Sequence, residues 1–341
     1  MHCKSNLFDP RVCPVSQARF RIFFFALLVL AGCAKSDPAG SSRLHTHITI
    51  AQYGHMLLYL PVYVAKAKGY FDDEGLTVEL VSTGGDEKTF AAVASGYAQY
   101  GVADPVFTAI AREQGKGGKV IASLVNGVPF WGVTFRKDIQ PIKELADFAG
   151  SRIAVYDEPS TNYAVMADAL NRAHVRGATI VQGSYGALLP MLRAGKADIA
   201  MELEPNVSIA EASGASVVYS LSERIQEFAF TGLTTSDDYL AKNSQQAQAV
   251  VRALARAVAN VHEDPTGALT IAEAEFPELP KPIVRSALYR LLSGNVIPSS
   301  LILTPTAWRN AVDVRRSLGE IKGTADFDQN VDMTLAKQAT R

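Results

Sequence analysis

Aromatic, amide and carboxylate side chains recur in this sequence just after stretches that are expected to form buried strands. These residue types bind small polar molecules through ring stacking and charge-assisted hydrogen bonds, and need no covalent chemistry to do so. Because loops at the carboxyl ends of strands line the ligand crevice of open α/β sheets, we take such positions as candidate ligand-binding residues. They are Gln52, Tyr53, His55, Tyr59, Gly85, Asp104, Phe107, Asn126, Trp131, Tyr156, Tyr163, Ser184, Tyr185, Glu202, Glu204 and Asn206.

Motifs for catalysis do not accompany these residues. The sequence has no Gly-X-Ser-X-Gly nucleophile elbow, no Walker A loop and no His-Glu-X-X-His zinc motif. His45 and His47 are closely spaced but fall in an expected tether. His55 could join Glu202 or Glu204 in a metal site, yet no second histidine is placed to help it. We therefore expect a protein that is not an enzyme and that needs no cofactor and no metal.

The composition is that of a globular protein with a sizeable core. Hydrophobic residues make up 48% of the 341 residues and charged residues 20%, which excludes a disordered chain. Lys and Arg number 33 and Asp and Glu 34, so the net charge of −1 gives no reason to expect a nucleic-acid partner. Cys3, Cys13 and Cys33 are too few for a disulfide framework and include no Cys-X-X-Cys pair.

The N-terminal 32 residues have the pattern of a secretory signal. A basic stretch precedes the apolar run 22–30, which is far shorter than the roughly 20 residues that span a bilayer. The run ends in Leu30-Ala31-Gly32-Cys33, which resembles the lipobox of bacterial lipoproteins and implies acylation of Cys33. We expect a signal peptide over 1–32, a lipidated tether over 33–45, and a protein anchored to a bacterial membrane in the periplasm or at the cell surface. A buried hydrophobic helix with an incidental cysteine is the alternative.

Strand and helix patterns alternate from residue 46 to about residue 230, which predicts mostly parallel sheets flanked by helices. A helix is expected to begin at Pro141 within this region. Beyond residue 236 the pattern becomes helical, with a long apolar helix face over 250–261 and further helices over 284–292 and 307–318.

One supersecondary unit occurs twice. Residues 78–105 and 179–205 each read as strand, glycine turn, helix, strand, and then an acidic residue followed by proline. In both units the two glycines, Gly84 and Gly96 or Gly183 and Gly195, lie 12 positions apart. The repeat indicates two similar lobes with a ligand crevice between them, although two common βαβ units could also agree by chance.

Several segments resemble one family of transport proteins. Residues 61–78 contain a small apolar helix, a Gly-Tyr-Phe turn, then Glu-Gly-Leu and a strand, and further matches lie in 94–96, 102–104, 144–155 and 192–198. These segments resemble the nitrate, sulfonate, taurine and thiamine-pyrimidine-precursor binding proteins, which are substrate-binding components of ABC importers. The resemblance implies a type II periplasmic-binding-protein fold, with lobe one over 46–132 plus 230–341 and lobe two over 133–229. It also implies a monomer that serves an ABC permease and its ATPase.

The expected loops favour a ligand rich in nitrogen. They carry many aromatic rings and seven acids against one base, and they include Asp86, Glu87, Lys88, Asp104, Asp157, Glu158, Glu202, Glu204 and Phe130. Such loops suit a nitrogen heterocycle, such as a thiamine pyrimidine precursor, or an amine. Each aromatic could instead be a core residue, and Ser160-Thr161 and Gly183-Ser184 could either hold an anion or cap helices. Sulfonate, taurine or nitrate binding, a pyrimidine-synthase-like enzyme and a tethered sensory domain are the alternatives.

Overall fold

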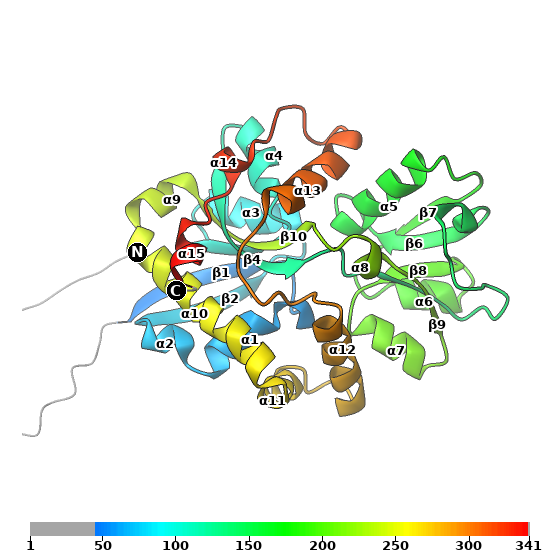
Figure 1. Ribbon diagram of the computed structural model, residues 1–341, viewed down its shortest axis with the longest axis horizontal. Coiled ribbons are helices and arrows are strands. Elements are labelled where there is room, and N and C mark those ends of the chain that lie inside the picture. Colours follow the sequence, from blue (N-terminus) through cyan, green and yellow to red (C-terminus); the bar gives the residue numbers. More distant parts are fainter. Residues whose placement is uncertain (1–44, 340–341) are drawn as a thin grey trace, which may run out of the picture. The chain divides into compact units, whose positions relative to one another are not determined.

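The computed structural model describes residues 45–339, which form two five-stranded sheets with helices packed on them (Figure 1). We call the assembly built on the sheet β2-β1-β3-β10-β4 lobe one, and the assembly built on β7-β6-β8-β5-β9 lobe two. The two-lobe α/β architecture predicted from the sequence is confirmed.

The strands lie close to the predicted positions. Lobe one contains β1 (Thr46–Gln52), β2 (Leu76–Ser82), β3 (Tyr100–Ala103), β4 (Gly118–Asn126) and β10 (Ala229–Ser236). Lobe two contains β5 (Trp131–Thr134), β6 (Arg152–Tyr156), β7 (Thr179–Gly183), β8 (Ile199–Glu202) and β9 (Ser216–Ser220).

Helices occupy most of the remaining chain. Those before β10 are η1 (Leu57–Tyr59), α1 (Leu60–Ala67), α2 (Tyr70–Asp73), α3 (Asp86–Ala94), α4 (Phe107–Glu113), η2 (Leu145–Phe148), α5 (Thr161–Arg172), α6 (Leu188–Arg193), α7 (Asn206–Ala212) and α8 (Leu221–Arg224). Those after it are α9 (Asp237–Lys242), α10 (Ser244–Glu263), α11 (Pro265–Glu275), α12 (Lys281–Ser293), α13 (Pro305–Ser317), α14 (Phe327–Asn330) and α15 (Thr334–Ala339).

One strand in each sheet runs against the other four. β10 pairs antiparallel with β3 and β4, while β1 pairs in parallel with β2 and β3. In lobe two, β5 pairs antiparallel with β8 and β9, while β6 pairs in parallel with β7 and β8. The reversed strands β5 and β10 are those that the chain enters when it crosses from one lobe to the other.

The repeated unit occupies equivalent places in the two lobes. β2, α3 and β3 surround β1 in lobe one as β7, α6 and β8 surround β6 in lobe two. The second glycines of the two units, Gly96 and Gly195, follow α3 and α6 with φ values of +79° and +66°. This left-handed conformation favours glycine and ends each helix before the next strand. The carboxyl ends of three parallel strands are thereby placed at one edge of each sheet.

The helical C-terminal third follows its apolar pattern. In α10 the predicted face is buried, with Val250, Leu254 and Val261 all fully covered, and the helix packs against α1. Asp264 then accepts a hydrogen bond from the Gly267 amide, and Pro265 opens α11. The predicted helices over 284–292 and 307–318 correspond to α12 and α13.

The helix predicted from Pro141 is wrong. The chain there forms only the short turn η2, because the Asp147 carboxylate accepts hydrogen bonds from the Lys143 and Glu144 amides and caps a single turn. Gly150 follows with a φ of +76° and directs the chain into β6. The proline therefore precedes an extended segment and not a helix.

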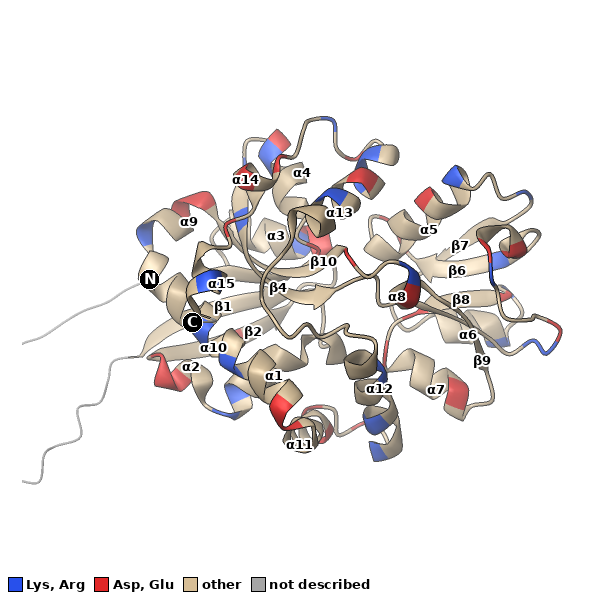
Figure 2. Cartoon of the chain, in the orientation of Figure 1, with Lys and Arg blue, Asp and Glu red and all other residues tan. Residues whose placement is uncertain are grey.

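The predicted signal peptide, Cys33 and all of the tether except His45 lie outside the described residues. Among residues 45–339 no helix is both long and apolar enough to cross a membrane. Figure 2 shows basic and acidic residues interspersed on the helices of both lobes.

Candidate functional site

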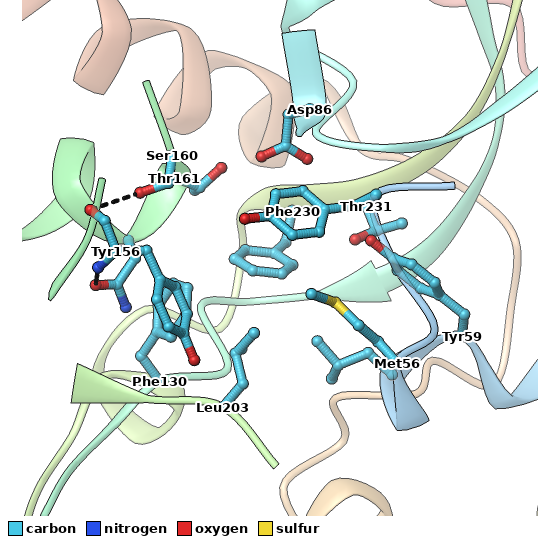
Figure 3. Close-up of a pocket in the computed structure, with 13 residues that line it drawn as sticks. Met56, Tyr59, Asp86, Phe130, Tyr156, Ser160, Thr161, Leu203, Phe230 and Thr231 are labelled. Carbon is cyan, nitrogen blue, oxygen red and sulfur yellow. Dashed lines mark hydrogen bonds between the residues drawn. The ribbon is translucent and has the colours of Figure 1, made fainter. Parts of the chain in front are cut away.

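A cleft lies where the carboxyl ends of the strands of the two lobes face each other. Its inner part is a cavity of about 30 Å³, enough for a water molecule or two (Figure 3). Its walls come from both lobes and are formed by Tyr53, Met56, Leu58, Tyr59, Asp86, Phe130, Tyr156, Ser160, Thr161, Asn162, Leu203, Phe230 and Thr231.

The inner cavity continues outward into a wider space of about 520 Å³. Five residues, Tyr53, Met56, Asp86, Tyr156 and Ser160, line both parts, so the two form one cleft. The combined space falls in the size range of small-molecule sites. The outer part adds Gly54, His55, Ser82, Gly84, Gly85, Glu87, Lys88, Asp157, Glu158, Pro159, Ser184 and Tyr185.

Aromatic rings make up much of the inner wall. Phe130 packs edge-on against Phe230, with ring centroids 5.4 Å apart, and against Tyr156 at 6.3 Å. Tyr185 of the outer part also contacts Tyr156, with ring centroids 5.6 Å apart. These contacts hold the rings in place and leave apolar surface for a flat or cationic ligand to pack on.

Asp86 is the acid of the inner cavity, at the first turn of α3. One of its carboxylate oxygens, Oδ1, accepts a hydrogen bond of 2.9 Å from the Asp104 amide. Burial, together with the nearby Asp104 carboxylate, raises the pKa of Asp86 to about 7. Asp86 therefore lies between its charged and neutral forms near neutral pH.

A buried arginine ties the two lobes together beside this acid. Arg315 of α13 donates to Asp104 Oδ2 of lobe one at 2.7 Å and to the Pro159 carbonyl of lobe two at 2.8 Å. Its Nη1 also donates to Glu320 Oε2 at 2.9 Å. The hydroxyl of Thr161 in lobe two donates to the same Asp104 oxygen at 2.6 Å. We call these five residues the interlobe clasp.

Arg315 was not among the candidates from the sequence, although a signal for it exists. Trp308, Ala311 and Arg315 follow one another at helical spacing, and all three are buried. A charged residue on the apolar face of a helix needs a buried partner. The partner, Asp104, lies 211 residues earlier in the chain, so the sequence pattern alone does not identify it.

Glu202 lies behind the cavity wall and not in it. Its Oε2 accepts hydrogen bonds from the Tyr156 hydroxyl at 2.5 Å and from Asn206 Nδ2 at 3.0 Å. The residue is fully buried, its Oε1 has no hydrogen-bond partner among the described residues, and burial raises its pKa to about 7. Glu202 and Asn206 thus position the Tyr156 ring.

Glu204 is also buried behind the wall. It pairs with Arg290 Nε of α12 at 2.6 Å and accepts hydrogen bonds from the Ser208 amide and hydroxyl. Five other candidates lie away from the two cavities. Gln52 contacts Tyr63 and Ser82, and the Asn126 side-chain oxygen accepts a hydrogen bond from the Ser123 hydroxyl. Phe107 packs under Arg315, Trp131 lies near Arg290, and Tyr163 is half-buried. Asp104 belongs to the clasp.

The candidates that do line the cleft are Tyr53, His55, Tyr59, Gly85, Tyr156, Ser184 and Tyr185. His55 pairs with Glu275 at 2.9 Å and stacks on Phe276, so it does not join Glu202 or Glu204. Among residues 45–339 no group of three His, Cys, Asp or Glu side chains is arranged to hold a metal ion. Ser160 accepts from the Tyr163 amide and is the N-cap of α5, whereas Ser184 does not cap α6.

The charges along the cleft are mainly negative. Of the described residues lining its two parts, Asp86, Glu87, Asp157 and Glu158 are acidic and Lys88 alone is basic. Arg315 is committed to Asp104 and Glu320. A strongly anionic ligand would thus meet more carboxylate than cationic charge.

Comparison with known proteins agrees with this geometry. The model of the family described as NMT1/THI5 like matches residues 58–268. The chain is 22% identical over 328 residues to "Putative binding protein YtlA" of Bacillus subtilis (strain 168), covering 93% of this chain and 95% of that protein. It is 23% identical over 291 residues to the 4-amino-5-hydroxymethyl-2-methylpyrimidine phosphate synthase of Aspergillus parasiticus, covering 80% of this chain and 82% of the synthase.

Solved structures share the fold. The periplasmic aliphatic sulphonate binding protein SsuA of Escherichia coli matches with a TM-score of 0.67 at 16% identity, covering 83% of this chain and 96% of SsuA. The periplasmic-binding-protein fold expected from the sequence is therefore confirmed. At this identity the likeness concerns the fold alone.

Proposed function

The chain belongs to the NMT1/THI5 like family, and from this premise we propose that it is the solute-binding component of an ABC importer. In this role the open lobes close around a small organic molecule, and the closed form delivers it to a permease. The observation that carries the proposal is the cleft itself, whose inner walls come from both lobes and are joined by the interlobe clasp.

The ligand class we propose is a nitrogen heterocycle, such as a thiamine pyrimidine precursor, or an amine. Aromatic walls supply stacking surface, and Asp86 supplies a hydrogen-bond acceptor inside the cavity. The sulphonate binder SsuA shares the fold, but the lining of this cleft offers one base against four acids. Sulfonate, taurine or nitrate is therefore the weaker choice for this chain.

Binding without turnover is part of the proposal. The synthase relative of Aspergillus parasiticus shows that an enzyme can have a related sequence, and a pyrimidine-forming activity is the competing function. The buried carboxylates Glu202 and Glu204 already hold Tyr156, Asn206, Ser208 and Arg290, so they serve structural roles in this state. A tethered sensory domain would need a membrane partner other than a permease.

The proposal also includes the export signal, the lipid anchor, the location and the lobe bounds expected from the sequence. Residues 1–32 act as an export signal, Cys33 carries lipid, and the mature protein is a periplasmic or cell-surface monomer. The proposed lobe bounds are those expected from the sequence, residues 133–229 for lobe two and residues 46–132 plus 230–341 for lobe one, with the crossings close to the starts of β5 at Trp131 and β10 at Ala229. Growth with labelled palmitate tests the anchor, since Cys33→Ala should abolish labelling of the chain.

Calorimetry on protein stripped of bound molecules tests the function. Titration with pyrimidines, amines, sulfonates and nitrate should give tight binding to a heterocycle or amine, with a decrease in the radius of gyration in solution scattering as the lobes close. Conversion of the bound molecule to a product would favour the enzyme. Tight binding of sulfonates alone would contradict the proposed ligand class.

A further inference from the structure

The charges beside the inner cavity do not balance. Asp86, Asp104 and Glu320 gather around one guanidinium, that of Arg315, which contacts Asp104 and Glu320 directly. Three carboxylates thus share one buried positive charge. Asp104 is buried and Asp86 and Glu320 are half-buried, so whenever Asp86 is charged the cluster carries more negative charge than the Arg315 guanidinium balances.

Asp86 is the member of the cluster that faces the cavity. Its Oδ1 accepts from the Asp104 amide, and no hydrogen-bond partner for its Oδ2 occurs among the described residues. Figure 3 shows the Asp86 carboxylate directed into the cavity, toward the aromatic side chains that line it. The second oxygen is therefore placed to accept from a bound molecule.

The rings around this oxygen suit a cation. Burial raises the pKa of Tyr53 to about 12 and the pKa of Tyr59 well above its usual value, and the nearby Asp86 carboxylate adds to both shifts. Both phenols are therefore neutral at physiological pH. Neutral rings present a negative face to a positively charged nitrogen and offer hydroxyl groups without competing for its charge.

We propose that Asp86, which lines both parts of the cleft, anchors a positively charged nitrogen of the ligand, an ammonium or amidinium group on a molecule that occupies the wider outer space of about 520 Å³. This inference rests on the proposed function and narrows its ligand class. The ligand cation balances the excess negative charge of the cluster, and the Asp104 amide holds the Asp86 carboxylate in place to bind it. Because Asp104 also belongs to the clasp, the anchored ligand and the closure of the lobes share one residue.

A matched set of probes tests the charge requirement. Benzamidine, benzyl alcohol and benzoate have similar rings and carry positive, zero and negative charge. Calorimetry and thermal shift at about pH 8, where the Asp86 carboxylate is mostly charged, should show binding of benzamidine, with the two others weaker by at least about tenfold.

Two variants test whether Asp86 is the residue that causes the preference for a cation. Asp86→Asn keeps an oxygen for the Asp104 amide but loses the charge, and it should weaken benzamidine at least about tenfold while leaving benzyl alcohol unchanged. Asp72→Asn removes the same charge at an exposed position of α2 and should leave all affinities unchanged. Without any probe, Asp86→Asn should melt at a higher temperature than the parent, because the repulsion between Asp86 and Asp104 is gone.

The groups that face Asp86 set its pH response. They are Asp104 of the loop after β3, Arg315 of α13, and Tyr53 and Tyr59 of the segment after β1. The affinity for benzamidine should fall as the pH drops below about 7 and Asp86 takes up a proton. Asp86→Asn should remove this dependence.

Three results overturn the inference. They are equal or tighter binding of benzyl alcohol or benzoate, unchanged benzamidine affinity in Asp86→Asn, and no binding of benzamidine at millimolar concentration. Each of them leaves the proposed function standing if the stripped protein still closes on another solute. Failure of the proposed function looks different, because the protein would then turn its bound molecule over or close on no solute at all.

Discussion

The guanidinium of Arg315 and the carboxylate of Asp104 meet 2.7 Å apart, and each side chain is only 2% exposed. The same guanidinium donates to the carbonyl of Pro159 in lobe two, so one side chain from α13 joins both sides of the cleft. The strength of a buried ion pair depends on the hydrogen bonds around it, and here two of them, from Arg315 to Pro159 and from Thr161 to Asp104, join the two lobes. The clasp therefore couples closure of the cleft to the stability of the protein.

Replacing Arg315 with methionine should destabilise the closed form. The variant leaves the buried Asp104 carboxylate without its cation, at a cost of about 3–5 kcal/mol in the free energy of unfolding, and it also removes the partner of the half-buried Glu320. Urea denaturation measures this loss, and solution scattering should show a larger radius of gyration. Arg315→Lys should recover little, because the three N–H donors of an ammonium radiate from one nitrogen and cannot reach the acceptors that Nη1 and Nη2 of the planar guanidinium contact.

A double variant separates the charge from the shape of the clasp. Arg315→Met with Asp104→Asn removes both members of the pair and should be more stable than Arg315→Met alone, because no buried charge is left unpaired at Asp104. If Arg315→Met unfolds at the same urea concentration as the parent and scatters identically, the clasp does not hold the lobes.

Glu202 should make the stability depend on pH. Burial raises its pKa from 4.5 to about 7 in the folded protein, so the folded state holds a proton that the unfolded state releases. The free energy of unfolding should then fall as the pH rises from about 4.5 to about 7, by about 3 kcal/mol at most. Glu202→Gln should remove this part of the slope, as measured by urea denaturation across that range.

The outcome for Glu202→Gln also reports on Tyr156. Glutamine retains an oxygen that accepts from the Tyr156 hydroxyl, so the ring should stay in place and the affinity for ligand should change little. Parallel pH profiles for the parent and Glu202→Gln would contradict the shifted pKa.

Local patterns in the sequence predicted most strands and helices and indicated two lobes, while the resemblance to transport proteins implied the periplasmic-binding-protein fold. The 12-residue glycine spacing placed α3 and α6 correctly, and the apolar period of α10 matched its buried face because both depend on neighbours in the chain. The helix expected at Pro141 failed for a local reason too, since the Asp147 cap limits the segment to one turn.

The cleft was predicted only in part, because its contacts join distant segments. The rule that ligand-binding residues lie at or just after the ends of strands correctly selected Tyr53, Tyr59 and Tyr156. The same rule also selected Glu202, whose side chain lies behind the cavity wall and contacts Tyr156 and Asn206. Which face of a loop a side chain takes depends on packing that the sequence pattern does not contain. Arg315 reaches the cleft from a helix far along the chain for the same reason.

Asp198 should stabilise lobe two at neutral pH and less in acid. It is buried, and hydrogen bonds from the Arg152 side chain and amide and from Arg136 hold its pKa well below its usual value. Because the folded pKa is lowered, the stabilisation is present above about pH 4 and is lost as the pH falls through the folded pKa. Asp198→Asn should lower the free energy of unfolding at pH about 7 by about 1–3 kcal/mol.

The control for Asp198 is Asp138, which also pairs with Arg136 but is exposed. Asp138→Asn should change the free energy of unfolding little, since exposed ion pairs contribute little. Equal losses for the two variants would show that burial does not distinguish these acids.

Arg290 links α12 to lobe two, as Arg315 links α13 to it. Its Nε lies 2.6 Å from Glu204 Oε1, and Glu204 is fully buried, so Arg290→Met leaves that carboxylate without its cation. Burial already raises the pKa of Glu204, and loss of Arg290 should raise it further. The variant should therefore be destabilised by a few kcal/mol at pH about 8 but much less at pH about 5, where the buried carboxyl can take up a proton. Arg316→Met removes an equivalent charge from an exposed pair with Asp313 and should change the melting temperature little at either pH. If Arg290→Met loses the same stability at both pH values, the cost arises from lost packing around α12 and not from the uncompensated charge of Glu204.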